Sequence, residues 1–265
     1  MLHHKPVSRV VRPGHNALKH YAYRIFIAIL LLSLFYAHQA SALNSGMVAS
    51  TSITPSTRIS ALGLKAQSTI RQLIQGIEAF ANEDYALAGR LFVPLANQGI
   101  GEAQFYLGLM HDSGLGVERD MVLAFKYYQE AAKEGHPGAQ HNLAVAYASG
   151  EGVATNPGQA LRWWRSAARQ GNADAQYNLG IVYAVGKLGV PRDLGRAKKW
   201  WRKAAISGDA MAQYNLGILY VKGDDTVRSY CEAARWWEKS AKKGLSQAAV
   251  ALEAIKNRKD YYTCW

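Results

Sequence analysis

From residue 70 onwards, apolar residues recur at intervals of three or four, which is the spacing of one buried face of an α-helix. Residues 70–80 show this spacing most clearly, with apolar side chains at Ile70, Leu73, Ile74, Ile77 and Phe80. Glycines interrupt the pattern at regular distances, and a glycine commonly ends a helix and permits the turn that follows. The pattern therefore predicts a succession of short helices joined by turns.

Three further features recur in step with these helices. Glutamines are spaced 36, 36 and 37 residues apart, and aromatic pairs and closing glycines keep similar steps. The positions are Gln104, Gln140, Gln176 and Gln213; Tyr127-Tyr128, Trp163-Trp164, Trp200-Trp201 and Trp236-Trp237; and Gly135, Gly171, Gly208 and Gly244. Such a period is typical of a solenoid, in which each unit packs on its neighbours. We expect four full repeats at 100–135, 136–171, 172–208 and 209–244, preceded by an atypical N-terminal repeat at 69–99.

Each repeat divides into a first helix, the A helix, and a second helix, the B helix. The A helix carries the pattern A-Q-x-x-L-G-x-x-Y, and the B helix carries the aromatic pair followed by two small residues. Large rings that face alanine or glycine let two helices pack closely without voids. We therefore expect the tryptophans to fill the core between repeats, and not to form a cage for a ligand.

These patterns closely resemble the Sel-one-like repeat family, a relative of the tetratricopeptide repeats. The resemblance rests on AQYNLGIVY at 175–183, the Gly-x-Gly-Val loop at 150–153 and the WW-x-x-A-A run that leads to Gly171. It implies an all-α fold, a right-handed superhelical α-solenoid of stacked antiparallel helix pairs, with the A helices on the concave side. It also implies a scaffold or adaptor more often than an enzyme. The chain departs from the family at His111 and Ala144, where tyrosine and glycine are expected.

The concave side implied by this resemblance is the expected binding site. Two residues before the Leu-Gly pair of each A helix should point inward: Phe105 and Tyr106, His141 and Asn142, Tyr177 and Asn178, and Tyr214 and Asn215. An asparagine amide can both donate to and accept from the backbone of an extended peptide, and the rings supply contact area. We expect a protein or peptide partner here. The alternative is that the asparagines cap or bridge neighbouring helices.

The N-terminal 42 residues have the pattern of a secretory signal peptide. A basic segment precedes a 13-residue, mostly apolar run at 25–37, and small residues precede a cleavage site between Ala42 and Leu43. This apolar run is shorter than the roughly 20 residues that span a membrane. We expect a periplasmic or secreted protein whose partner lies in the cell envelope. The alternative is an uncleaved N-terminal anchor that leaves the repeats facing the periplasm.

Two further segments flank the repeats. Residues 43–68 are rich in serine and threonine and lack a helical period. They predict a flexible linker, because they cannot bury enough apolar surface to offset the entropy lost on ordering. Residues 245–265 predict a capping helix and a tail.

The chain is basic, with a formal net charge of +12 that falls to +7 without residues 1–42. The B helices carry many of these charges: Arg162, Arg165, Arg169, Lys198, Lys199, Arg202, Lys203, Lys242 and Lys243. We expect them on a solvated outer surface. The alternative is that they bind an anionic polysaccharide of the envelope or a membrane surface. No basic run is interleaved with aromatic residues, so nucleic acid is not an expected partner.

Few residues suggest catalysis. Ser240-Ala241-Lys242-Lys243 spells S-x-x-K, and some secreted members of the family have been linked to β-lactams, but the S-D-N and K-T-G partners are absent. Ser240 also stands where other repeats have alanine, so packing explains it. No histidine or cysteine spacing fits a metal site, and neither a cofactor nor an enzyme activity is expected. Cys231 and Cys264 form either a disulfide that fastens the tail or two unpaired thiols.

Overall fold

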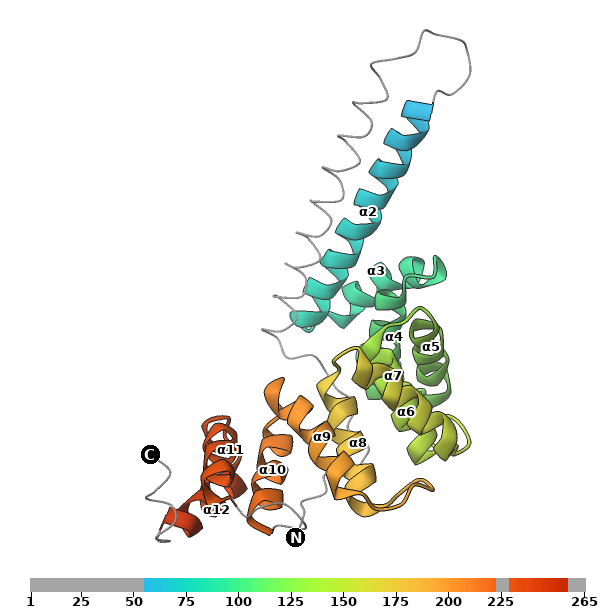
Figure 1. Cartoon of the computed structure of the whole chain (residues 1–265). Coiled ribbons are helices and arrows are strands. Elements are labelled where there is room, and N and C mark those ends of the chain that lie inside the picture. The colour runs from blue at the N-terminus through green and yellow to red at the C-terminus, as the bar shows by residue number, and fades with distance from the viewer. Residues whose placement is uncertain (1–54, 223–228, 257–265) are drawn as a thin grey trace. The chain divides into compact units, whose positions relative to one another are not determined.

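The computed structural model describes residues 55–222 and 229–256, with side chains from residue 63 onwards (Figure 1). In these ranges the chain forms eleven α-helices and no β-strand. The helices are α2 (Pro55–Ala81), α3 (Tyr85–Asn97), α4 (Gly101–Ser113), α5 (Met121–Lys133), α6 (Pro137–Ser149), α7 (Pro157–Arg169), α8 (Ala173–Val185), α9 (Leu194–Ile206), α10 (Ala210–Lys222), α11 (Tyr230–Lys242) and α12 (Ser246–Lys256). The all-α fold that the sequence predicts is confirmed.

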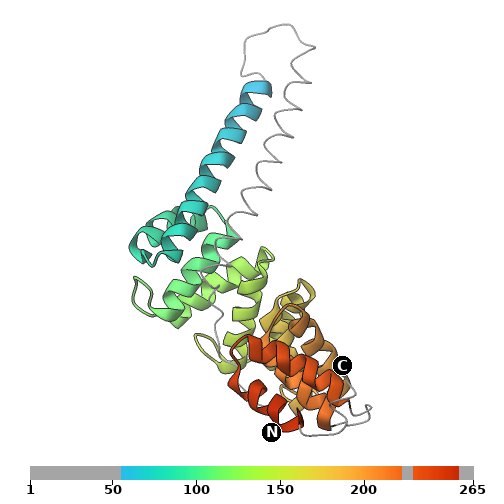
Figure 2. The ribbon, with the colours of Figure 1, turned by 90° about the vertical axis from the view of Figure 1, so that its left-hand side faces the viewer.

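The chain forms two compact units. The described part of the N-terminal unit, residues 55–120, contains α2, α3 and α4. The described part of the repeat unit, residues 121–222 and 229–256, contains α5 to α12. Within each unit every helix packs against the next one along the chain, as Figures 1 and 2 show for the repeat unit. The repeat unit is therefore a run of packed helix pairs, with α6, α8 and α10 as A helices and α5, α7, α9 and α11 as B helices.

Polar side chains cap the starts of these helices. Asn156, Asp193 and Ser229 precede the B helices α7, α9 and α11, and each accepts a hydrogen bond from the backbone N–H three residues further on. Asn172 caps α8 in the same way, whereas at α6 the acceptor is Nδ1 of His136. Each cap satisfies one of the donors that a helix leaves unpaired at its start.

Glycines end the A helices α6 and α8. Gly150 and Gly186 have φ angles of 82° and 76°, in the left-handed region that glycine adopts without steric cost. The loop that follows is closed by a backbone hydrogen bond, from the residue that caps the B helix to the carbonyl of Tyr147 or Tyr183, at 2.8 Å in both repeats. The third repeat keeps this bond although its loop is one residue longer.

The second tryptophan of each pair fills the core of the repeat unit. Trp164 and Trp201 are fully buried, and Trp237 is also buried. A Cβ atom on Gly180 would collide with the indole of Trp201, and one on Gly217 with that of Trp237. Glycine thus lets each B helix approach its A helix closely, and the prediction that these tryptophans fill the core is confirmed.

In the third and fourth repeats, the first tryptophan of the pair joins the repeat to the one before it. Trp200 of α9 is half-buried against the cluster that contains Trp164, and Trp236 of α11 is half-buried against the cluster that contains Trp201. The aromatic pair therefore packs within a repeat and between repeats, which explains why both rings recur.

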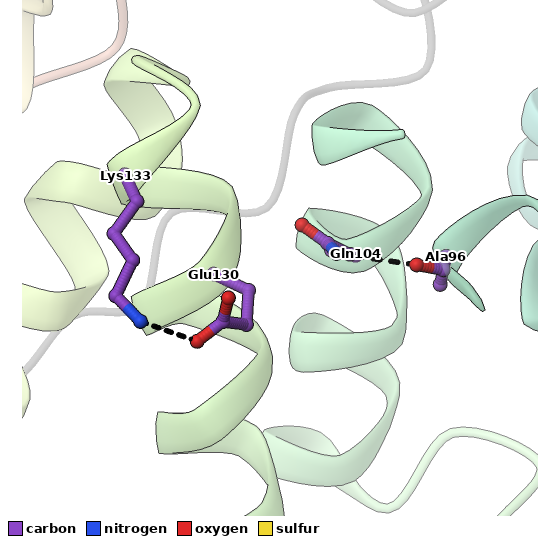
Figure 3. A network of polar contacts seen from close by, with 4 residues as sticks. All are labelled: Ala96, Gln104, Glu130 and Lys133. Carbon is purple, nitrogen blue, oxygen red and sulfur yellow. Dashed lines mark hydrogen bonds and ion pairs between the residues drawn. The ribbon is translucent and has the colours of Figure 1, made fainter. Parts of the chain in front are cut away.

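The recurring glutamine ties each A helix to the helix before it. Its side-chain N–H donates to a backbone carbonyl eight residues earlier, across the turn between the two helices. The pairs are Gln104–Ala96 at 3.2 Å in the N-terminal unit (Figure 3), and Gln140–Ala132 at 3.2 Å, Gln176–Ala168 at 3.0 Å and Gln213–Ala205 at 3.0 Å in the repeat unit. In the repeat unit each acceptor is the second of the two small residues of a B helix. The glutamine and the small pair therefore recur together.

Helix α2 begins at Pro55, inside residues 43–68, whose composition predicted a flexible linker. Residues 63–68 of this helix are exposed, including Leu64. An exposed stretch needs no apolar period, so the pattern of apolar residues did not indicate a helix there. Residues such as Lys65 and Ala66 nonetheless have a high helix propensity.

Four parts of the chain addressed by the sequence predictions lie outside the described residues. They are residues 1–42, the cleavage site between Ala42 and Leu43, residues 43–54 of the predicted linker, and the tail with Cys264. Among the residues that are described, none of the helices has both the length and the apolar character needed to cross a membrane.

Candidate functional site

The eight residues expected to contact a partner lie on A helices, two on α4 of the N-terminal unit and six on α6, α8 and α10 of the repeat unit. Seven of them are buried, and Tyr214 is half-buried. Among the asparagines, Asn142 is 2% exposed, Asn178 is 9% exposed and Asn215 is not exposed. Their role in binding stays a prediction, and their burial limits how a partner can reach them.

The pair on α4 belongs to an aromatic cluster of the N-terminal unit. The rings of Tyr106 and Phe92 stack with centroids 4.9 Å apart, and Phe80 meets Tyr106 edge-on at 5.0 Å. The Phe105 ring lies 5.7 Å from that of Tyr106. Offset and edge-on aromatic contacts of this kind stabilise a core. Because α4 also lacks the asparagine, its pair differs from the three pairs of the repeat unit.

In the third and fourth repeats the aromatic member of the pair holds the A helix against its own B helix. The backbone carbonyl of Tyr177 accepts a hydrogen bond from the indole N–H of Trp201 at 3.2 Å. The carbonyl of Tyr214 accepts the equivalent bond from Trp237 at 3.0 Å. The asparagine that follows each tyrosine is therefore placed by a rigid contact between two helices.

The side-chain amides of Asn142 and Asn215 are buried without hydrogen bonds. Neither the nitrogen nor the oxygen of either amide has a partner among the residues that the structure describes. The alternative in which asparagines cap or bridge a neighbouring helix therefore finds no support at these two positions. Leaving a buried polar group unsatisfied costs about 1–3 kcal/mol, so these amides would gain from a partner that satisfied them.

The second repeat departs from the third and fourth at its tryptophan. The Nε1 atom of Trp164 is buried and has no hydrogen-bond partner within the described part of the chain. Ala144 stands where the later repeats have Gly180 and Gly217. Since a methyl group at those glycines would collide with the indole, the methyl of Ala144 accounts for the missing bond.

The basic residues expected on an outer surface lie on B helices, and seven of the nine are exposed. The two half-buried ones contact tyrosines. Arg165 donates to the hydroxyl of Tyr183 at 3.2 Å, and the Lys198 ammonium lies 4.2 Å from the ring centroid of Tyr220. The seven exposed side chains form the surface to which an anionic partner could bind, as the alternative in the sequence analysis requires.

The sequence predictions named Arg162 and Lys199 but missed that they belong to a recurring set. A cation immediately precedes the aromatic pair in all four repeats, and all four side chains are exposed: Lys126, Arg162, Lys199 and Arg235. Their spacing of 36, 37 and 36 residues was visible in the sequence and could have revealed them.

The residues considered for catalysis have structural contacts. Ser240 is fully buried, and its hydroxyl donates to the carbonyl of Ala210 at 2.7 Å. This bond explains a serine at a position that is alanine in other repeats, and it leaves the hydroxyl facing protein instead of a substrate. No cluster of three or more His, Cys, Asp or Glu side chains in the described ranges could hold a metal ion.

Cys231 is half-buried in the first turn of α11 and is not a free thiol. Its expected partner, Cys264, lies outside the described residues. The disulfide between them therefore stays a prediction.

Known proteins resemble the chain in both sequence and fold. The Sel1 repeat family matches residues 101–136, 137–172, 173–209 and 210–245, which together are more than half of the chain. The crystal structure of a Sel1 repeat protein from Oxalobacter formigenes is 30% identical with a TM-score of 0.65, and the match covers 69% of this chain and 74% of that one. No curated protein matches the chain.

A second solved structure is a protective antigen present in uropathogenic Escherichia coli strains, which displays an SLR fold. It is 26% identical with a TM-score of 0.67. The match covers 95% of this chain and 52% of the antigen, so the chain spans about half the length of that protein. The likeness supports the solenoid of helix pairs that the sequence predicts.

Proposed function

Because the chain belongs to the Sel1 repeat family, whose members are generally scaffolds for protein–protein interaction and typically not enzymes, we propose that its repeat unit binds a partner protein through its A helices. In this proposal an extended segment of the partner lies across α6, α8 and α10. The amides of Asn142, Asn178 and Asn215 form hydrogen bonds with its backbone.

The observation that carries the proposal is the pair of buried, unpartnered amides at Asn142 and Asn215. The two residues occupy the same position in their A helices, and Asn178 occupies it in the helix between them. A peptide backbone offers alternating N–H and C=O groups, and an asparagine amide can satisfy both. A row of three such amides suits an extended segment better than a compact ligand.

A partner can reach this row most easily at its most exposed asparagine and at the tyrosine that precedes Asn215. Tyr214 is half-buried and Asn178 is 9% exposed, whereas Asn142 and Asn215 are covered more completely. A partner therefore contacts Tyr214 and Asn178 first, and side chains around the other two amides change rotamer as it binds. Such rotamer changes are common at protein interfaces, even where the backbone moves little.

Site-specific photo-crosslinking tests the location of the interface. A photoreactive phenylalanine analogue replaces Tyr214 in the full-length chain, and in a matched control it replaces Lys126, which is exposed on the B helix α5. In cells of the source organism, a crosslinked partner is expected from position 214 and not from position 126. The opposite result would place the interface on the B helices and would refute the proposal.

An asparagine variant tests the proposed hydrogen bonds. Asn178→Ala removes one bond to the partner backbone, and the expected loss is about two- to twelvefold in affinity, since a net hydrogen bond contributes about 0.5–1.5 kcal/mol. Asn82→Ala is the control, because Asn82 is an exposed asparagine in a turn of the N-terminal unit. If both variants bind the crosslinked partner as well as the wild type, the asparagine row has no role in binding.

We also propose that the protein is exported, so that its partner lies in the cell envelope. The support is the sequence of residues 1–42, with its basic segment, its 13-residue apolar run and the small residues before Leu43. Fractionation of the source cells followed by N-terminal sequencing tests this proposal. A mature chain that begins at Leu43 in the envelope fraction is expected, and an intact N-terminus in the cytoplasmic fraction would contradict it.

A further inference from the structure

The B helices α7 and α9 present an unusual concentration of positive charge. Neither helix contains an aspartate or glutamate. Their exposed cations are Arg162, Arg169, Arg196, Lys199, Arg202 and Lys203, which we call the basic surface. On α7 the two cations are seven residues apart, and on α9 they recur at intervals of three or four, so each set shares one face of its helix. The two helices contribute to one packed region, because Trp200 of α9 packs on the cluster of Trp164.

Five of the six cations of the basic surface have no ion-pair partner among the described residues. The sixth, Arg196, forms an ion pair with Asp193 at 3.1 Å. On the next B helix, α11, the situation is different: Arg235 pairs with Glu232 at 2.8 Å and Lys242 pairs with Glu238 at 2.8 Å. The chain thus compensates cations of α11 within the helix and leaves most of those on the two preceding B helices, α7 and α9, available to an anionic partner.

The surroundings of the basic surface distinguish between kinds of anionic partner. Surfaces that insert into membranes combine cations with exposed large apolar residues. On α7 and α9 the only large apolar residue that is strongly exposed, among those described, is Ile206 at the end of α9. The aromatic rings are also covered: Arg162 lies over Trp163 at 5.5 Å and Lys203 over Trp200 at 4.7 Å. Covered rings offer no open face on which the bases of a nucleic acid could stack.

From these observations we propose that the basic surface docks an acidic segment of a protein partner, rich in aspartate and glutamate. Carboxylates match the planar donor geometry of arginine, which binds them in a bidentate manner. Protein is also the class of partner that scaffolds of this family generally bind. This docking surface is separate from the asparagine row, since it lies on B helices and uses charge instead of backbone hydrogen bonds.

The test measures binding of a fluorescent oligoglutamate peptide to the full-length chain by anisotropy, with oligoglutamine as the uncharged control. The variant is Lys199→Glu/Arg202→Glu on α9. The matched control, Arg235→Glu/Lys242→Glu on α11, makes the same change in net charge on another B helix. We expect binding that weakens as salt is added, because salt screens exposed charges. The α9 variant should lose about tenfold or more in affinity, since facing like charges repel, and the α11 control much less.

An equal loss of affinity for oligoglutamate in both variants would overturn the proposal, because it would indicate an effect of net charge alone. Failure of the wild type to bind oligoglutamate would overturn it as well. Binding of phosphatidylglycerol vesicles in preference to the peptide would replace the protein partner with a membrane. If the α9 variant fails to fold by circular dichroism, Lys199→Gln/Arg202→Gln serves in its place. Asn178→Ala is expected to leave oligoglutamate binding unchanged, so failure of this inference and failure of the proposed function are separable.

Discussion

The second and third repeats are built from the same pair of helices, yet they hold their buried tryptophans differently. In the third repeat the indole of Trp201 lies against Gly180 and donates to the carbonyl of Tyr177. In the second repeat Ala144 replaces the glycine, and Trp164 is equally buried but makes no such bond with any described residue.

In a second difference, it is the second repeat that has the additional hydrogen bond. In the second repeat the oxygen of the Gln140 amide accepts a hydrogen bond from Gln170 at 2.8 Å. In the third, the oxygen of Gln176 has no partner among the described residues. Each repeat therefore lacks one polar contact that the other has, the indole hydrogen bond in the second and the hydrogen bond to the glutamine oxygen in the third. Both repeats bury the large tryptophan ring completely, so we infer that this burial contributes most to their stability.

The largest expected effect follows from removing the ring itself. Trp201→Ala is expected to lower the free energy of unfolding by about 3–5 kcal/mol, as large-to-small core substitutions do. Trp164→Ala should lower the free energy of unfolding by about 1 kcal/mol less than Trp201→Ala does, because the Trp164 indole has no hydrogen bond to lose. Trp200→Ala is the control, since this ring is half-buried. Urea denaturation followed by circular dichroism measures all three, and equal losses at Trp200 and Trp201 would contradict a dominant role for burial.

The exchange of glycine and alanine tests the cause of the difference. Gly180→Ala is expected to destabilise by about 1–3 kcal/mol through overpacking against Trp201. Helix propensity alone predicts the opposite sign, since alanine is favoured over glycine by about 1 kcal/mol in a helix interior. Ala144→Gly should change the stability by less than about 1 kcal/mol, because the lost propensity offsets a regained hydrogen bond. A stabilised Gly180→Ala variant would show that the contact with the indole is not tight.

Much of the fold could be predicted from the sequence, because the repeat is specified by residues whose spacing is visible. The glutamines and the aromatic pairs make contacts that recur with the same period, and the closing glycines Gly135, Gly171, Gly208 and Gly244 all have a positive φ angle. The N-terminal part of α2 could not be predicted in this way, since its residues 63–68 are exposed and carry no apolar period. Ala144 was visible as a departure from the family, but its consequence for the Trp164 indole requires the position of the ring.

The sequence predicted which helical positions carry the candidate site, but not how exposed their side chains are. The sequence placed an asparagine after an aromatic residue or histidine in three A helices, and the structure has all three at the same helical position. How far each amide is covered depends on packing between elements distant in the sequence, so neither the burial of Asn215 nor the half-exposure of Tyr214 follows from the motif. The cations before the aromatic pairs were visible in the sequence. Only the structure shows that they are exposed and can therefore contact a partner.

A smaller effect isolates the indole hydrogen bond. Trp201→Phe and Trp164→Phe remove similar volumes from equally buried sites, but only the first removes a bond to a carbonyl. The Trp201 variant is therefore expected to lose about 1 kcal/mol more stability than the Trp164 variant. Urea denaturation of the two variants side by side gives the difference. If Trp164→Phe proved the more costly, the indole of Trp164 would have to bond a group outside the described residues.

The smallest expected effect concerns the caps of the two A helices. Asn172 caps α8 with an amide oxygen, and His136 caps α6 with Nδ1, which accepts from the N–H of Ala139 at 3.0 Å. Two different side chains therefore satisfy the same backbone donor at the start of the A helix.

The variant His136→Asn gives α6 the cap that α8 has. We expect its free energy of unfolding to stay within about 0.5 kcal/mol of the wild type, since both side chains accept from the same N–H. His136→Ala and Asn172→Ala each remove the acceptor, and each should lower the free energy of unfolding by about 0.5–1 kcal/mol. Urea denaturation of the three variants beside the wild type measures the differences. A His136→Ala variant as stable as the wild type would show that the imidazole does not serve as the cap.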